Sequence, residues 1–185
     1  DIFDREKAFI DNVLNKIQND NPALKIIMEH ITTKDAVDYV FSGNQNLAAT
    51  VTTHHLSTNR NDLLAGGIRP HFYCLPVVKR ESHRLALVEA VVSGSQKFFL
   101  GTDSAPHLDQ DKESFCGCAG CFTATNTLEI LAHIFEEQKA LHKLELFTSI
   151  NGAKFYGKNI NSDKIRIVKK DKPTSFPEKI STPHG

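Results

Sequence analysis

The stretch Phe98-Phe99-Leu100-Gly101-Thr102-Asp103-Ser104-Ala105-Pro106-His107 is the part of this sequence that best indicates the fold. It begins as a short apolar run and stops at a glycine, which is typical of a strand buried on both faces of a parallel sheet. In a (β/α) barrel, chemistry takes place where strands end and loops begin, and Asp103 stands at such a point. Asp103 could bind a metal ion or accept a proton there, although an aspartate in this position can also simply cap the following turn.

Helical and strand patterns alternate on both sides of this stretch. The hydrophobic spacing predicts helices over 4–18, 33–43, 80–93, 124–138 and 142–150, and strands over 24–29, 47–52, 98–100 and 165–168. Long loops over 53–79 and 104–122 separate them. This order favours an α/β fold with parallel strands, over residues 1–168, followed by an irregular tail over 169–185. Three main strands are few for a free-standing sheet, so we expect part of a larger fold.

Composition excludes several classes of partner. Lysine plus arginine and aspartate plus glutamate both number 22 in the 185 residues, which gives no electrostatic case for binding nucleic acid or an anionic membrane. No apolar run approaches the ~20 residues that a membrane-spanning helix needs. The four cysteines are a poor disulfide framework, because three of them crowd into one short segment. We therefore expect a protein of a reducing compartment, the cytoplasm.

Polar groups of catalytic type follow each of the three predicted strands. They are His30, the pair His54-His55, and Asp103 with His107. The ends of parallel strands meet at one edge of a sheet, and hydrolytic metal sites use nitrogen and oxygen ligands of this kind. Each histidine could equally be a hydrogen-bonded structural residue. The sequence contains no His-x-Glu, His-Glu-x-x-His or Gly-x-Ser-x-Gly, which excludes zinc deaminases, zincins and α/β-hydrolases.

The cluster Cys116-Gly117-Cys118-Ala119-Gly120-Cys121 allows two interpretations. It could clip a metal ion, with Cys74 as a fourth thiolate. We favour a tight glycine-containing loop whose backbone approaches a ligand and whose reduced thiols pack as small apolar groups.

Several strings of the sequence together resemble dihydroorotases, of the single-function bacterial and protist-like type within the amidohydrolase superfamily. The resemblance covers residues 2–168 and rests on Glu29-His30-Ile31-Thr32-Thr33, Asn59-Arg60-Asn61, Gly66-Gly67-Ile68-Arg69-Pro70-His71, Tyr73-Cys74-Leu75-Pro76, Gly101 to His107, and Lys112-Glu113-Ser114 through Cys121. It implies a (β/α)₈ TIM-type barrel with two zinc ions in each active site, a homodimer, and reversible ring closure of N-carbamoyl-L-aspartate to dihydroorotate in pyrimidine synthesis.

The resemblance also implies roles for individual residues. His30 corresponds to a histidine that binds one zinc ion from the sixth strand. Asp103 corresponds to the aspartate of the eighth strand that binds the other zinc ion and serves as general base and acid. His107 corresponds to a contact with a substrate carboxylate, and Leu75 and Ala119 to positions whose backbone groups hold the substrate. The substrate is anionic, so the pocket needs cations, and besides His107 the sequence does not make them obvious.

The remaining parts of the family pattern are absent from this sequence. A His-x-His pair, a bridging carboxylated lysine, a further zinc histidine and a substrate-binding arginine should all precede Asp1. We therefore expect a C-terminal portion of the barrel, strands six to eight with their flanking helices, that is unstable and inactive alone. Two alternatives remain: another cyclic-amide hydrolase, such as a hydantoinase or allantoinase, and a non-catalytic homologue or subunit.

Overall fold

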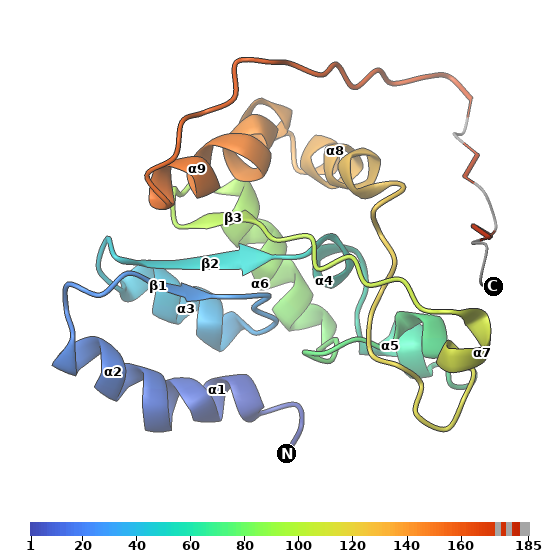
Figure 1. Ribbon diagram of the computed structural model, residues 1–185, viewed down its shortest axis with the longest axis horizontal. Helices are drawn as coiled ribbons and strands as arrows, with labels where there is room; N and C mark the ends of the chain where they lie inside the picture. The colour runs from blue at the N-terminus through green and yellow to red at the C-terminus, as the bar shows by residue number, and fades with distance from the viewer. Residues whose placement is uncertain (173–174, 177–178, 182–185) are drawn as a thin grey trace.

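The computed structural model describes residues 1–172, 175–176 and 179–181. It has three parallel strands in the order β1-β2-β3, flanked by helices (Figure 1). The strands are β1 (Ile26–Met28), β2 (Leu47–Val51) and β3 (Phe98–Leu100). The longer helices are α3 (Lys34–Ser42), α6 (Glu81–Val92) and α8 (Thr127–Glu137). The α/β architecture with parallel strands is thus confirmed, as are the helices and strands expected at these positions.

A long helical segment opens the chain. It consists of α1 (Arg5–Phe9), a π-helical stretch η1 (Ile10–Leu14) and α2 (Asn15–Asp20). Its apolar side buries Ile10 and Leu14 against the core. The loop between β2 and α6 is more structured than the sequence predicts, since it contains α4 (Thr53–Ser57), α5 (Arg60–Leu64) and the 3₁₀ turn η2 (Pro70–Phe72). These helices are too short to leave a clear hydrophobic period.

The remaining helices follow β3. They are α7 (Asp109–Lys112), the 3₁₀ turn η3 (Leu141–Lys143), the π-helical η4 (Leu146–Ile150) and α9 (Asn151–Phe155). The strand expected over 165–168 is wrong: this segment is exposed and outside the sheet. Its apolar residues Ile165, Ile167 and Val168 instead line a surface pocket beside α8, and Lys164 and Lys169 form ion pairs with Glu145 and Glu136. Part of the tail predicted over 169–185 lies outside the described residues.

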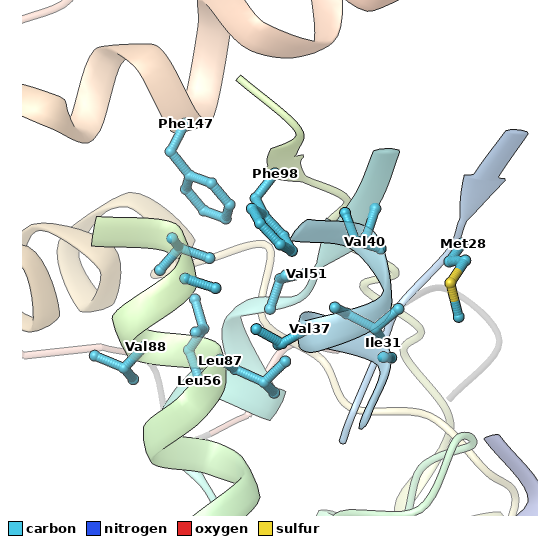
Figure 2. Close-up of a cluster of buried hydrophobic side chains, with 14 of the residues drawn as sticks. Met28, Ile31, Val37, Val40, Val51, Leu56, Leu87, Val88, Phe98 and Phe147 are labelled. Carbon is cyan, nitrogen blue, oxygen red and sulfur yellow. The ribbon is translucent and has the colours of Figure 1, made fainter. Parts of the chain in front are cut away.

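The main core lies between the sheet and the helices that cover one of its faces. Leu47, Ala49 and Val51 alternate along β2 and belong to this core. Figure 2 shows Val51 within it, together with Leu87, Phe98 and Phe147. Burying such side chains contributes roughly 1.5–3 kcal/mol each. Among the described residues, no helix is both long and apolar enough to span a lipid bilayer.

The outer edge of β1 carries no further strand among the described residues, since β1 pairs only with β2. A pocket of about 640 Å³ runs along this edge, lined largely by apolar side chains that include Phe9, Ile27, Ile31 and Val77. An unpaired parallel edge beside apolar side chains is a surface that folded proteins normally cover.

Candidate active site

The ends of β1 and β3 bring His30 and Asp103 together. Their side chains approach to 4.0 Å between Nε2 and Oδ2, although β2 lies between the two strands. Both residues adopt left-handed backbone conformations, with φ of 55° at His30 and 42° at Asp103. Such values are uncommon outside glycine, and asparagine, aspartate and histidine are the residues that reach them most often. The two turns therefore direct one imidazole and one carboxylate toward a shared space.

Thr50 of the central strand holds His30 in this position. The backbone N–H of His30 donates to Thr50 Oγ1 at 2.8 Å, and the N–H of Ile31 donates to the Thr50 carbonyl at 3.1 Å. Gly101 makes room for this threonine, because a Cβ at position 101 would lie only 2.7 Å from Thr50 Cβ. The position of His30 after β1 therefore depends on Gly101 after β3, although the two residues are far apart in the sequence.

A partly buried carboxylate clamp fixes the segment just after His30. The side chain of Glu6 accepts hydrogen bonds from the backbone N–H and the hydroxyl groups of both Thr32 and Thr33. Both threonines are 2% exposed, so these donors depend on Glu6 for their hydrogen bonds. Thr33 also caps α3, since its hydroxyl accepts from the N–H of Ala36. Sequence reasoning missed Glu6, because nothing local marks its partners.

The pair His54-His55 divides into two different environments within α4. His55 is fully engaged: Nδ1 lies 2.8 Å from Thr52 Oγ1 and Nε2 lies 2.7 Å from the Pro76 carbonyl oxygen. Burial, with a further contribution from His54, lowers the pKa of His55 to about 3. Nδ1 and Nε2 of His54 are both buried, and neither has a hydrogen-bond partner in the described part of the chain. Burial lowers the pKa of His54 to about 4, partly opposed by the charge of Asp103.

His54, His55 and Cys74 could together be considered as a metal-binding group, because one ligand atom from each lies within 4.8 Å of the others. A tetrahedral zinc ion would hold such atoms only about 3.3–3.8 Å apart. Both ring nitrogens of His55 are also already hydrogen-bonded. We therefore interpret this group as a packed, hydrogen-bonded cluster beside the site.

The cysteines do not form the metal clip that was one interpretation of the sequence. All four are free in the structure; Cys116 is exposed, whereas Cys74 and Cys121 are buried side by side in a small apolar cluster with Leu63, Val77 and Val78. Hydrogen bonding to Cys121 and burial raise the pKa of Cys74, so its thiol is protonated and packs as an apolar group. Within the described residues, neither Cys116 nor Cys118 belongs to a group that could hold a metal ion.

The loop that follows Asp103 returns to lie directly beside it. Ser104 pairs with Cys121 in an isolated parallel bridge, and the N–H of Ala105 donates to the Cys121 carbonyl at 3.0 Å. This fold-back places Nε2 of the exposed His107 at 3.2 Å from the Ala119 carbonyl oxygen, to which it donates in the tautomer protonated at Nε2. A Cβ at Gly120 would lie 2.8 Å from His107 Nε2, so the close approach needs a glycine there.

The segment that contains Leu75 is hydrogen-bonded to the loop that contains Ala119. The side chain of Leu75 is exposed and a cis peptide bond joins this residue to Pro76. The N–H of Gly120 donates to the Tyr73 carbonyl at 2.9 Å, which joins the Tyr73–Leu75 segment to the Cys118–Gly120 segment. The structure thus joins the two backbone segments expected to hold the substrate, and it joins His30 to Asp103.

Comparison with known proteins gives a consistent picture. The model of the amidohydrolase family matches residues 1–169. The chain is 62% identical to a dihydroorotase of Ruegeria sp. (strain TM1040) and 59% identical to one of Agrobacterium fabrum, over all 185 residues and 54% of each relative. It therefore spans about half the length of the curated relatives it matches.

Solved structures are similar as well. A crystal structure of dihydroorotase from Saccharomyces cerevisiae, in complex with 5-fluoroorotic acid, matches with a TM-score of 0.79 and 39% identity, over 86% of this chain and 45% of that one. A dihydroorotase from Campylobacter jejuni matches with a TM-score of 0.79 and 38% identity, over 89% of this chain and 46% of that one. An L-hydantoinase from Arthrobacter aurescens, at 20% identity and a TM-score of 0.66, shares the fold.

Proposed function

The chain belongs to the amidohydrolase family, and on this premise we propose that it is the C-terminal part of a dihydroorotase. The proposed reaction interconverts N-carbamoyl-L-aspartate and dihydroorotate, a step of pyrimidine synthesis. The observation that carries the proposal is the convergence of His30 and Asp103 at the ends of two parallel strands, in a chain 62% identical to a dihydroorotase. "The complete protein" below means the longer enzyme that would contain this chain.

We propose that β1, β2 and β3 are strands six, seven and eight of a (β/α)₈ barrel. The free edge of β1 and the apolar pocket along it support this, because the fifth strand of a closed barrel would cover them. The same proposal accounts for the coverage of 54% of the relatives' length.

A two-zinc site fits the residues at the strand ends. An imidazole nitrogen and a carboxylate oxygen are ligands that zinc prefers, and in the structure they face each other at 4.0 Å without a hydrogen bond between them. His30 would bind one zinc ion and Asp103 the other, with the remaining ligands coming from the missing part of the barrel. Zinc, when bound, would polarise the amide carbonyl and make an attacking water more acidic.

The residues of this chain would then perform proton transfer and substrate binding. The carboxylate of Asp103 would accept the proton of the attacking water and deliver it to the ring nitrogen as the cyclic amide opens. The exposed His107 would bind a substrate carboxylate, and backbone groups of Leu75 and Ala119 would hold the rest of the substrate. The contact between His107 and the Ala119 carbonyl supports this, since it places both at one surface.

A direct assay tests the proposed function. The complete protein should hydrolyse dihydroorotate and close N-carbamoyl-L-aspartate, with little turnover of hydantoin or allantoin. Turnover of hydantoin at a comparable kcat/KM would instead favour the alternative cyclic-amide hydrolases. No turnover of any cyclic amide by the zinc-loaded protein would favour a non-catalytic homologue. Sedimentation of the same sample tests the homodimer that we propose from the resemblance, and the four free thiols support a cytoplasmic location.

A further inference from the structure

Lys112, the last residue of α7, is a buried cation without a carboxylate partner. It is only 3% exposed, although lysine is among the residues least often buried. Its ammonium group donates to three backbone carbonyls, those of Tyr73 at 2.9 Å, Cys118 at 2.7 Å and Gly120 at 2.9 Å. Across residues 1–172, 175–176 and 179–181, no carboxylate forms an ion pair with it.

The number of acceptors indicates the charge state of this lysine. A neutral amine has two N–H groups, whereas an ammonium group has three and therefore satisfies all three carbonyls. Burial lowers the pKa of Lys112, but the carbonyl oxygens favour the charged form by hydrogen bonding to it. The positive charge of Lys112 is thus offset by the three peptide carbonyls and by the ring of Tyr73, whose centroid lies 5.8 Å from the ammonium nitrogen.

The three carbonyls belong to the two segments whose backbone is expected to hold the substrate. Tyr73 precedes Leu75 by two residues, and Cys118 and Gly120 flank Ala119 on both sides. A single ammonium group therefore sets the spacing between these segments, with support from the hydrogen bond between Gly120 and Tyr73. Moving Lys112 would displace both segments together.

We propose that Lys112 is a positioning residue that holds the Tyr73–Leu75 and Cys118–Gly120 backbones as one surface for the anionic substrate. This inference rests on the proposed function and deepens it. The chain has no net charge and the substrate is anionic, so a cation fixed beneath the binding surface favours substrate affinity. Lys112 does not reach the reacting atoms in this account, so its loss should affect binding more than chemistry.

Lys97 offers a matched control. Its ammonium group also donates to three backbone carbonyls, those of Val40, Phe41 and Gly43, but it immediately precedes β3 and so lies at the opposite end of the sheet from Asp103. Lys97→Met and Lys112→Met therefore each remove three hydrogen bonds from an ammonium group to backbone carbonyls, although Lys97 is only partly buried. If Lys112 had only a structural role, both variants would lose stability and neither would show a specific effect on substrate binding.

The experiment compares these variants in the complete protein. For Lys112→Met we expect KM for dihydroorotate to rise about tenfold or more while kcat stays within about threefold, and for Lys97→Met we expect both constants to stay near wild type. Hydrogen exchange should show faster exchange at the amides of Ala105 and Gly120 in Lys112→Met alone. Equal KM values in the two variants of an active enzyme would overturn the proposal.

Two further outcomes are informative. If the wild-type protein does not turn over dihydroorotate, the proposed function fails, and the exchange at Gly120 still decides whether Lys112 holds the two segments. If Lys112→Met does not fold, the ¹⁵Nζ resonance of Lys112 can be followed in the wild-type protein. That resonance should be a slowly exchanging ammonium signal that shifts when N-carbamoyl-L-aspartate is added, and an absent or unmoved signal would contradict the proposal.

Discussion

His30 and Asp103 face each other at 4.0 Å across the end of a strand that separates their own strands. Neither residue reaches this position by strand geometry alone, since both leave their strands through left-handed turns. Thr50 of β2 then anchors the turn at His30 through its hydroxyl and its carbonyl group. The central strand thus aligns a site to which it contributes no proposed ligand.

The carboxylate of Asp103 should be essential for turnover by the complete protein. Asp103→Asn keeps the shape but removes the negative charge and the basic oxygen, so kcat should fall about a thousandfold or more. Asp20→Asn, at the exposed end of α2, is the control and should leave kcat unchanged. Assays of dihydroorotate hydrolysis with zinc content measured in parallel would check this, and activity near wild type in Asp103→Asn would remove the catalytic assignment.

Glu6 should contribute far more to stability than an exposed acidic residue on the same helical segment. Glu6→Ala leaves buried donors of Thr32 and Thr33 unpaired, which should cost about 2–4 kcal/mol of the free energy of unfolding. Asp11→Ala removes only the exposed pair with Lys7 and should cost less than about 1 kcal/mol. Urea unfolding of the complete protein measures both, and equal losses would contradict the clamp.

The free energy of unfolding should decrease as the pH is lowered, because His55 is buried in its neutral form. Its pKa is about 3 in the folded state, below the ordinary value of 6.5. The unfolded chain therefore binds the extra proton between these values, and each pH unit below 6.5 should remove up to about 1.4 kcal/mol. Above pH 6.5 the contribution is constant. A His55→Gln variant should show a shallower decline of the urea midpoint between pH 6.5 and 5, whereas the exposed His133→Gln should follow wild type.

The four thiols should react with a water-soluble disulfide reagent in order of exposure. Cys116 is exposed and Cys118 partly exposed, so both should react in the native protein, with Cys116 faster. Cys74 and Cys121 are buried and should react only after denaturation. Removing the fastest phase with Cys116→Ser, followed by mass spectrometry of the labelled peptides, checks the assignment. Rapid labelling of Cys74 in the native protein would show that the small apolar cluster of Leu63, Cys74, Val77, Val78 and Cys121 opens readily.

The chain alone should not be an active, stable monomer. The open edge of β1 and the apolar pocket beside it would be exposed to water, which forgoes about 25 cal/mol for each Å² of apolar surface left uncovered. We expect aggregation or association with a separately produced N-terminal half, and turnover only after the two are combined. A cooperative thermal transition of the monomeric chain, together with dihydroorotate turnover, would contradict this.

Much of the site could be predicted from the sequence because its signals are local. The stop at Gly101 indicates the end of β3 and so the position of Asp103, and Thr33 and Gly43 mark the two ends of α3. His30 follows β1 in the same way. Such features depend on neighbouring residues, so a single sequence contains them.

The residues that hold the site together could not be found in this way. Glu6 and Lys112 act on backbone groups from distant segments, and any sequence offers backbone groups everywhere. The prediction of a strand over 165–168 was wrong for a related reason. The β-branched residues of this segment suit a strand, but in the structure they line a surface pocket instead of pairing with the sheet. Only the three-dimensional arrangement decides which partner such a segment meets.

The left-handed turns at His30 and Asp103 limit how the proposed pair of metal ligands could be re-engineered. Exchanging His30 for cysteine, or Asp103 for glutamate, keeps a metal-binding atom, yet these residues tolerate positive φ less well than histidine, aspartate or asparagine. A designer seeking a different metal preference would therefore meet a conformational obstacle before a chemical one. Libraries at these positions should vary the adjoining residues as well, so that each new side chain can be presented from a relaxed main chain.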